Sequence, residues 1–75
     1  MTDLLAYTYV KLVLEQEFPV RYLGLINGHN LHYELTSMIE LCAPLLIGLE
    51  EDDPFLRYEL IGIIAVYLQE LEPDN

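Results

Sequence analysis

The last third of the sequence constrains the fold most strongly, because its apolar residues recur at the spacing of an α-helix. Asp53 is a favourable N-cap, and Pro54 suits the first helical position, where its missing N–H costs nothing. We expect this helix to run to about Leu71 and to stop before Pro73. One wide apolar arc contains Leu56, Leu60, Ile61, Ile64, Ala65, Tyr67, Leu68 and Leu71. An arc of this width predicts packing against more than one neighbouring element.

A second helical pattern precedes this segment. Leu31, Leu35, Met38, Cys42, Leu45 and Leu49 follow one another at steps of four and three. The spacing predicts a helix over about 31–51 that packs within the chain and forms an antiparallel hairpin with the helix at 54–71. Pro44 removes a backbone donor, so we expect a kink or a break there. As an alternative, Ser37 and Glu40 have the spacing of a capping box that would start the helix late.

The first half of the sequence fits a helical interpretation that makes the whole chain mainly α, a small bundle of about four helices. Thr2 or Asp3 is a suitable cap for a helix from Leu4 to about Glu17. Within that helix, a lysine and a glutamate four residues apart, at positions 11 and 15, are expected to pair. A short second helix, 19–28, would begin at a proline and be closed by a glycine.

The same half also fits a sheet. Ala6–Leu14 contains Tyr, Thr and Val at a density typical of a strand. Asn27 and Gly28 stand between two apolar runs and form a favourable hairpin turn. The alternative fold is therefore α+β, with an N-terminal three-stranded antiparallel sheet followed by two C-terminal helices.

Size and apolar content predict one domain with more apolar surface than its interior can hold. The 75 residues form a single small acidic domain, 1–75, and 53% of them are hydrophobic, including sixteen Leu and six Tyr. A chain of this size buries only roughly 60% of its unfolded surface. Some apolar side chains should therefore stay exposed, where contiguous patches usually mark an interface. The alternative is that Tyr rings simply lie half-exposed with their hydroxyls outward.

The excess of negative charge indicates which class of partner the protein is suited to bind. Thirteen Asp and Glu oppose only Lys11, Arg21 and Arg57, which gives a net charge of −10. This negative field argues against direct binding to nucleic acid or to an anionic membrane surface, because few cations are present to contact phosphate. It favours a basic protein partner, such as a nucleic-acid-binding protein or a toxin. The alternative is that the acidity only keeps an apolar chain in solution.

Acidic side chains and tyrosines are the candidate partner-binding residues. They are Glu50, Glu51, Asp52, Asp53, Glu15, Glu17, Tyr7 and Tyr9. The first four form the one charge run, which is either a solvated turn that favours the positive end of the next helix or a fixed contact for Lys and Arg of a partner. Arg57 falls within the apolar arc of the last helix, and we expect its head to turn back to this charge run.

No pattern in the sequence indicates catalysis, a cofactor or a metal, so we expect no enzyme. His29 and His32 stand three apart, but zinc sites need more ligands than this pair supplies, and we interpret both as surface histidines beside a turn. Cys42 lies on the apolar seam and is interpreted as a buried small hydrophobe, since reactive cysteines lie in electropositive, accessible places.

Residues 45–62 resemble one HEAT-type helical hairpin. In that family an acidic turn with Asp-Pro and a following Arg joins two antiparallel helices, and Asp53, Pro54 and Arg57 match those positions. The resemblance extends over residues 31–71, whereas a solenoid needs about three such repeats or more. It implies a hairpin of helices and no particular function.

Two functional hypotheses follow. The first is an acidic protein-binding inhibitor or neutraliser, comparable to immunity proteins, antitoxins or phage inhibitors, that docks on a basic site of a partner. The second is a non-catalytic structural subunit or homo-oligomer, such as a homodimer, that packs through surplus Leu and Tyr. A single cysteine without a signal peptide indicates a reducing, cytoplasmic setting. The longest apolar runs are far shorter than the ~20 residues that span a bilayer.

Overall fold

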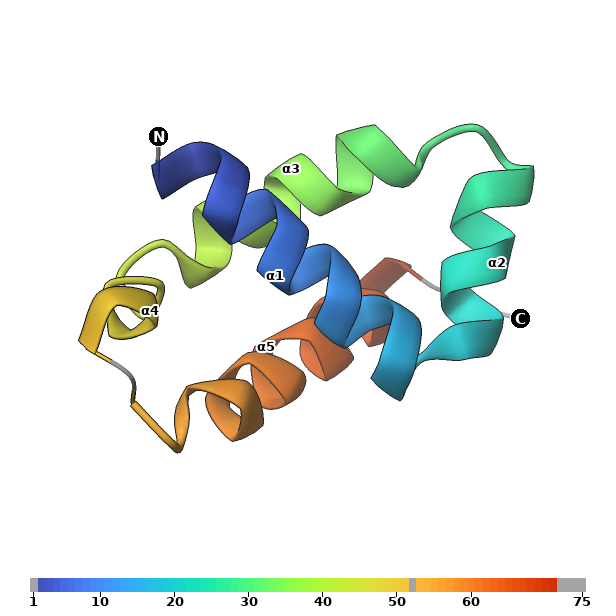
Figure 1. The fold of residues 1–75 in the computed structure, drawn as a ribbon. Coiled ribbons are helices and arrows are strands. Elements are labelled where there is room, and N and C mark those ends of the chain that lie inside the picture. Colours follow the sequence, from blue (N-terminus) through green and yellow to red (C-terminus); the bar gives the residue numbers. More distant parts are fainter. Residues whose placement is uncertain (1, 52, 72–75) are drawn as a thin grey trace.

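Helices account for the whole architecture of the described residues. A computed structural model of the chain describes residues 2–51 and 53–71. Over these ranges five helices follow one another: α1 (Thr2–Glu17), α2 (Pro19–Asn27), α3 (Leu31–Cys42), α4 (Gly48–Glu51) and α5 (Leu56–Leu71). α1, α3 and α5 pack against one another, and α2 bridges α1 and α3 at one end (Figure 1). The mainly α bundle is confirmed, and the α+β alternative is wrong, because no strand forms in these ranges.

α1 is helical although it is rich in residues that favour strands. Ala6, Val10, Val13 and Leu14 are all buried, and they recur at steps of four, three and one, which places them on one face of a helix. Burying one Val or Leu gains about 1.5–3 kcal/mol, whereas a β-branched residue in a helix costs about 0.7 kcal/mol or less relative to Ala. Burial therefore decides the conformation. The predicted caps, the side chains of residues 2 and 3, lie outside the described part of the chain.

The Asn-Gly pair that suggested a hairpin turn instead ends α2. Gly28 keeps a right-handed backbone with φ −83°. His29 takes the left-handed conformation with φ 60° and donates its N–H to the Ile26 carbonyl at 3.0 Å. The N–H of Asn30 donates to the Leu25 carbonyl at 3.1 Å, which completes a Schellman motif. The helix therefore ends at Asn27 with Gly28 as its C-cap, as predicted, and His29 takes the left-handed position that follows.

Pro44 divides the long helix predicted over 31–51. α3 ends at Cys42, and the N–H groups of Leu45 and Leu46 both donate to the Cys42 carbonyl, at 2.8 and 3.1 Å. The N–H of Gly48 then donates to the Leu45 carbonyl at 2.9 Å, so the chain continues in tight turns until α4 begins. The expected break is confirmed. The hairpin partner of α5 is therefore α3 alone, with α4 in the connection between them.

The starts of α3 and α5 test two capping predictions. Asp53 Oδ1 accepts a hydrogen bond from the N–H of Phe55 at 2.9 Å, which confirms the predicted cap, although regular α5 begins only at Leu56. The capping box that would start α3 late is wrong. Ser37 lies in the middle of α3, and its hydroxyl donates to the Tyr33 carbonyl at 3.3 Å.

The core lies between α1, α3 and α5. Its fully buried side chains are Val10, Val13, Leu14, Leu35, Met38, Cys42, Leu60 and Ile64. The predicted apolar arc of α5 is buried along its centre, at Leu56, Leu60, Ile64 and Leu68, whereas Leu71 at its end is exposed. The seam of the preceding segment is likewise internal, since Leu35, Met38 and Cys42 are fully buried.

The interior does not absorb all the apolar side chains. The molecule is elongated, 40 × 22 × 19 Å, and its accessible surface is 5213 Å², against about 4,700 Å² expected for a chain of this mass. Among the described residues, thirteen large apolar side chains are exposed, from Leu71 at 38% to Val20 at 80%. The surplus expected from composition is therefore present on the surface.

Candidate partner-binding surface

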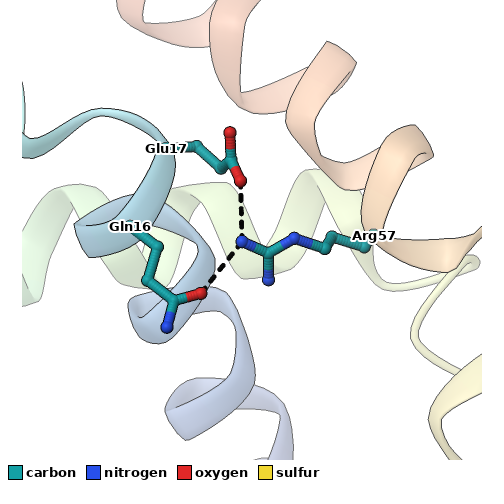
Figure 2. Close-up of polar contacts among 3 residues, drawn as sticks. All are labelled: Gln16, Glu17 and Arg57. Atoms are coloured by element: carbon teal, nitrogen blue, oxygen red, sulfur yellow. Dashed lines mark hydrogen bonds and ion pairs between the residues drawn. The ribbon is translucent and has the colours of Figure 1, made fainter.

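Arg57 pairs with the end of α1. Its Nη2 atom lies 2.7 Å from Glu17 Oε2 and 2.9 Å from Gln16 Oε1, so the guanidinium joins the first turn of α5 to the last turn of α1 (Figure 2). The prediction that this head turns back to the acidic run at 50–53 is wrong. α1 and α5 pack side by side, which brings the carboxyl end of α1 within reach of the Arg57 side chain.

The other two basic side chains are also engaged inside the molecule. Arg21 of α2 donates from Nη2 to the Leu68 carbonyl at 3.0 Å, one of the last carbonyls of α5, which have no partner within the helix. The Lys11 ammonium lies 5.4 Å from the centroid of the Tyr22 ring. Tyr22 raises the pKa of Lys11, first by side-chain hydrogen bonding and then by its charge, and Glu15 adds a smaller electrostatic contribution. All Lys and Arg side chains therefore serve internal contacts.

Most carboxylates consequently remain uncompensated. Within the described ranges, the exposed carboxylates without an ion-pair or hydrogen-bond partner are those of Glu15, Glu40, Glu50, Glu51, Glu59 and Glu70. The net charge of −10 is thus carried outward, where it creates a negative field around the molecule.

The acidic candidate residues do not form a single site. Glu50 and Glu51 are exposed on α4, and Asp53 is exposed just beyond it. Glu15 and Glu17 are exposed near the carboxyl end of α1, which Figure 1 places at a different end of the molecule from α4. Glu17 is moreover occupied by the ion pair with α5. Asp52 lies outside the described residues.

The two candidate tyrosines are only half-exposed. The hydroxyl of Tyr7 lies 3.1 Å from His32 Nδ1, and the two rings lie 5.6 Å apart. Tyr9 packs against the core. Both rings therefore support the fold of α1 against its neighbours, and the most exposed apolar groups lie elsewhere.

A hollow between α1, α3 and α4 is the feature that sequence reasoning missed. Its volume is about 220 Å³, and its lining residues are Leu5, Ala6, Ile39, Ala43, Leu46, Ile47, Leu49 and Glu50. Leu5 is 50% exposed and Ile47 62% exposed at this place. A cavity of ~150 Å³ holds a benzene ring, so this hollow is large enough for one large apolar side chain. The sequence feature that indicates this hollow is the break at Pro44, because the apolar residues after the break no longer continue along the face of α3.

Two further apolar surfaces are present. A more open groove of about 360 Å³ between α3 and α5 is lined by Leu41, Gly62, Ile63, Val66, Tyr67 and Glu70. The outward face of α2 exposes Val20, Leu23 and Ile26, and that helix contains no acidic residue. The three surfaces differ in charge, since carboxylates border the hollow and the groove but not the face of α2.

No chemistry-bearing cluster is seen in the described part of the chain. His29 and His32 are both exposed, and no group of His, Cys, Asp and Glu there has an arrangement suited to a metal ion. Cys42 is buried, and burial raises the pKa of its thiol, which disfavours the reactive thiolate.

The fold defines a small all-helical bundle. Comparison of the chain with protein families, curated proteins and solved structures gave no match. The described helices include none with the length and apolar character needed to cross a membrane. A proposal for the function therefore rests on the charges and the apolar surfaces of the molecule.

Proposed function

We propose that this chain is an acidic, non-enzymatic inhibitor or neutraliser that docks on a basic site of a partner protein, in the manner of an immunity protein or antitoxin in the cytoplasm. The observation that carries the proposal is that Lys11, Arg21 and Arg57 are all engaged in internal contacts. The exposed carboxylates are therefore not compensated by the chain's own Lys and Arg, and a basic surface of another protein would complement them.

The apolar surface supplies the second requirement of such an interface. Charge complementarity accelerates encounter and excludes wrong partners, whereas buried aromatic and aliphatic anchors hold the complex. Exposed Leu5, Ile47 and Tyr58 lie in the same small molecule as the uncompensated carboxylates. Affinity should accordingly fall as salt rises but should not vanish, because apolar burial is not screened by ions.

Capture from a lysate of the source organism, followed by titration of the purified partner, tests this proposal. The expected partner is basic, and its affinity falls steadily between about 0.05 and 0.5 M salt. A variant with Glu40, Glu50, Glu51 and Glu59 changed to Gln should bind more weakly, whereas the charge-neutral control Gln69→Ser should bind as the parent does. A purified partner that binds parent and four-amide variant equally, at every salt concentration, contradicts the proposal.

The outward face of α2 favours a second candidate function, a structural homo-oligomer. Val20 and Leu23 are 80% and 57% exposed, and no carboxylate on this helix repels a second copy. Sedimentation of the parent against Val20→Ser/Leu23→Ser tests it, with Ile47→Ser as the control. A dimer that the double variant abolishes, and the control does not, supports self-association through α2.

A further inference from the structure

We propose that the hollow between α1, α3 and α4 is the anchor pocket of the binding surface, and that it receives a Leu- or Phe-sized side chain from a cationic amphipathic segment of the partner. This inference rests on the proposed function and names the place and the chemistry of the contact. A segment of this kind presents an apolar side chain with Lys or Arg about one helical turn away.

The lining of the hollow selects an apolar anchor. Seven of its eight lining residues are apolar, and the eighth is Glu50. Ile47 and Leu5 stay largely exposed in the isolated chain, so a side chain inserted between them removes apolar surface of both partners from water. The walls come from three helices of the packed bundle and from the turns after Pro44, so the pocket is present before any partner binds.

The rim of the hollow selects a cation beside that anchor. Glu50 lines the hollow, and Glu51 follows it on the same short helix. Asp53 is held against this helix, because its N–H donates to the Gly48 carbonyl at 3.2 Å. The chain's own Lys and Arg are committed to other contacts, with Tyr22, the carboxyl end of α5 and Glu17. A Lys or Arg from outside therefore finds uncompensated carboxylates at this rim.

The two other apolar surfaces fit such a segment less well. The outward face of α2 contains no carboxylate, and its one charged residue is Arg21, whose guanidinium reaches α5. The groove between α3 and α5 contains the single carboxylate of Glu70, and its walls are more open. Of the three surfaces, the hollow is the one that joins a more enclosed apolar lining to Glu50, with the exposed Glu51 beside it on α4.

A designed peptide serves as the probe. The full chain, labelled for NMR, is titrated with a helical Leu/Lys peptide of about 18 residues, whose Leu and Lys lie on opposite faces. A Leu/Glu peptide and a Ser/Lys peptide of the same pattern are the matched controls. We expect saturable shifts that centre on residues 5–6, 39–43 and 46–50 with the Leu/Lys peptide only.

Paired variants separate the hollow from the rest of the surface. Ile47→Ser should weaken binding of the Leu/Lys peptide about fivefold to tenfold, whereas Val20→Ser, an equally small change at an exposed aliphatic residue of α2, should leave it within about twofold. Glu50→Gln should weaken binding more than Glu15→Gln, although each variant removes one negative charge. Circular dichroism and thermal unfolding establish that every variant is folded.

Several outcomes would overturn the inference. They are shifts spread evenly over the acidic surface, shifts centred on α2 or on the groove between α3 and α5, equal binding of the Ser/Lys peptide, or no binding of the Leu/Lys peptide at all. The proposed function fails separately, when no basic partner binds the parent in a salt-dependent way. A basic partner whose affinity is unchanged by Ile47→Ser would remove the anchor pocket and leave the broader function standing.

Discussion

The hydroxyl of Tyr67 donates a hydrogen bond to Glu34 Oε1 across the interface of α5 and α3, at 2.5 Å. Glu34 is 9% exposed and is the buried charged residue of the described ranges. A buried carboxylate needs a donor, because its hydration is lost and not otherwise replaced. The contact therefore links the two hairpin helices and gives the buried carboxylate its donor.

Removing this donor should destabilise the fold. We expect Tyr67→Phe to lower the free energy of unfolding by about 1–3 kcal/mol, because it leaves the Glu34 carboxylate buried and without its partner. Tyr58→Phe, the same change at a ring that is 72% exposed, should alter stability by less than about 0.5 kcal/mol. Urea unfolding at neutral pH measures both values, and equal effects of the two variants would contradict the assignment.

The chain should lose stability in alkali. Burial, together with the hydrogen bond to Glu34, raises the pKa of Tyr67, and burial raises the pKa of Cys42. In both groups the folded state favours the neutral form. Their contribution is therefore complete below the unfolded pKa values, about 9 for Cys42 and about 10 for Tyr67, and is lost as the pH rises through the higher folded values. Urea midpoints between pH 8 and about 11 measure this loss, which should be smaller in Tyr67→Phe.

The ion pair between Arg57 and Glu17 should contribute little to stability. The two side chains are 33% and 39% exposed, so solvent screens their attraction. A double-mutant cycle of Arg57→Gln and Glu17→Gln should give a coupling free energy of about 0.2–1 kcal/mol that shrinks as salt rises. A coupling above about 2 kcal/mol that does not change with salt would mean that the contact is better shielded than its exposure indicates.

The left-handed residue after α2 offers a stabilising substitution. His29 adopts φ 60°, a conformation that costs a residue with a Cβ about 1 kcal/mol and costs glycine nothing. We expect His29→Gly to raise the free energy of unfolding by up to about 1 kcal/mol. Gly28→Ala is the opposite control, because its Cβ would lie 3.0 Å from Asn30 Oδ1 and 3.3 Å from the Gly24 carbonyl. Thermal unfolding of both variants checks the opposite signs.

Added salt should change the binding of a basic partner and the self-association of the chain in opposite directions. Docking on a basic partner should weaken as salt rises, because opposite charges are screened. Self-association of a chain with a net charge of −10 should strengthen, because repulsion between like charges is screened. Sedimentation of the isolated chain at about 0.05 and 0.5 M salt measures the second effect, and calorimetric titration with a basic partner measures the first. A dimer that dissociates as salt rises would contradict the repulsion argument.

Local patterns were sufficient for the second half of the fold. The recurrence of Leu56, Leu60, Ile64 and Leu68 at steps of four predicted the buried face of α5, and Pro44 predicted the break after α3. The first half was ambiguous, because the β-branched residues of α1 suit a strand as well as a buried helical face. Only the packing of that face against α3 and α5 resolves the choice.

The surface contacts and the hollow could not be predicted from local sequence patterns. Exposure of Glu50, Glu51 and Asp53 was expected from their charge. The partner of Arg57 was predicted wrongly, because Glu17 is forty residues away in sequence and adjacent only in space. The hollow also escaped prediction, because its lining residues come from α1, α3, α4 and the turns between them. Six of the eight lie between residues 39 and 50, around the break at Pro44, whereas Leu5 and Ala6 of α1 are distant in sequence and join them only through packing.

Sequence alone determined the helices of the second half, the break at Pro44, the uneven charge and the excess of apolar side chains, because each of these depends on neighbouring residues or on composition. Tertiary structure decided which charges cancel and which apolar groups remain in water. Both outcomes depend on distances between residues far apart in the chain, and those distances exist only after α1, α3 and α5 have packed.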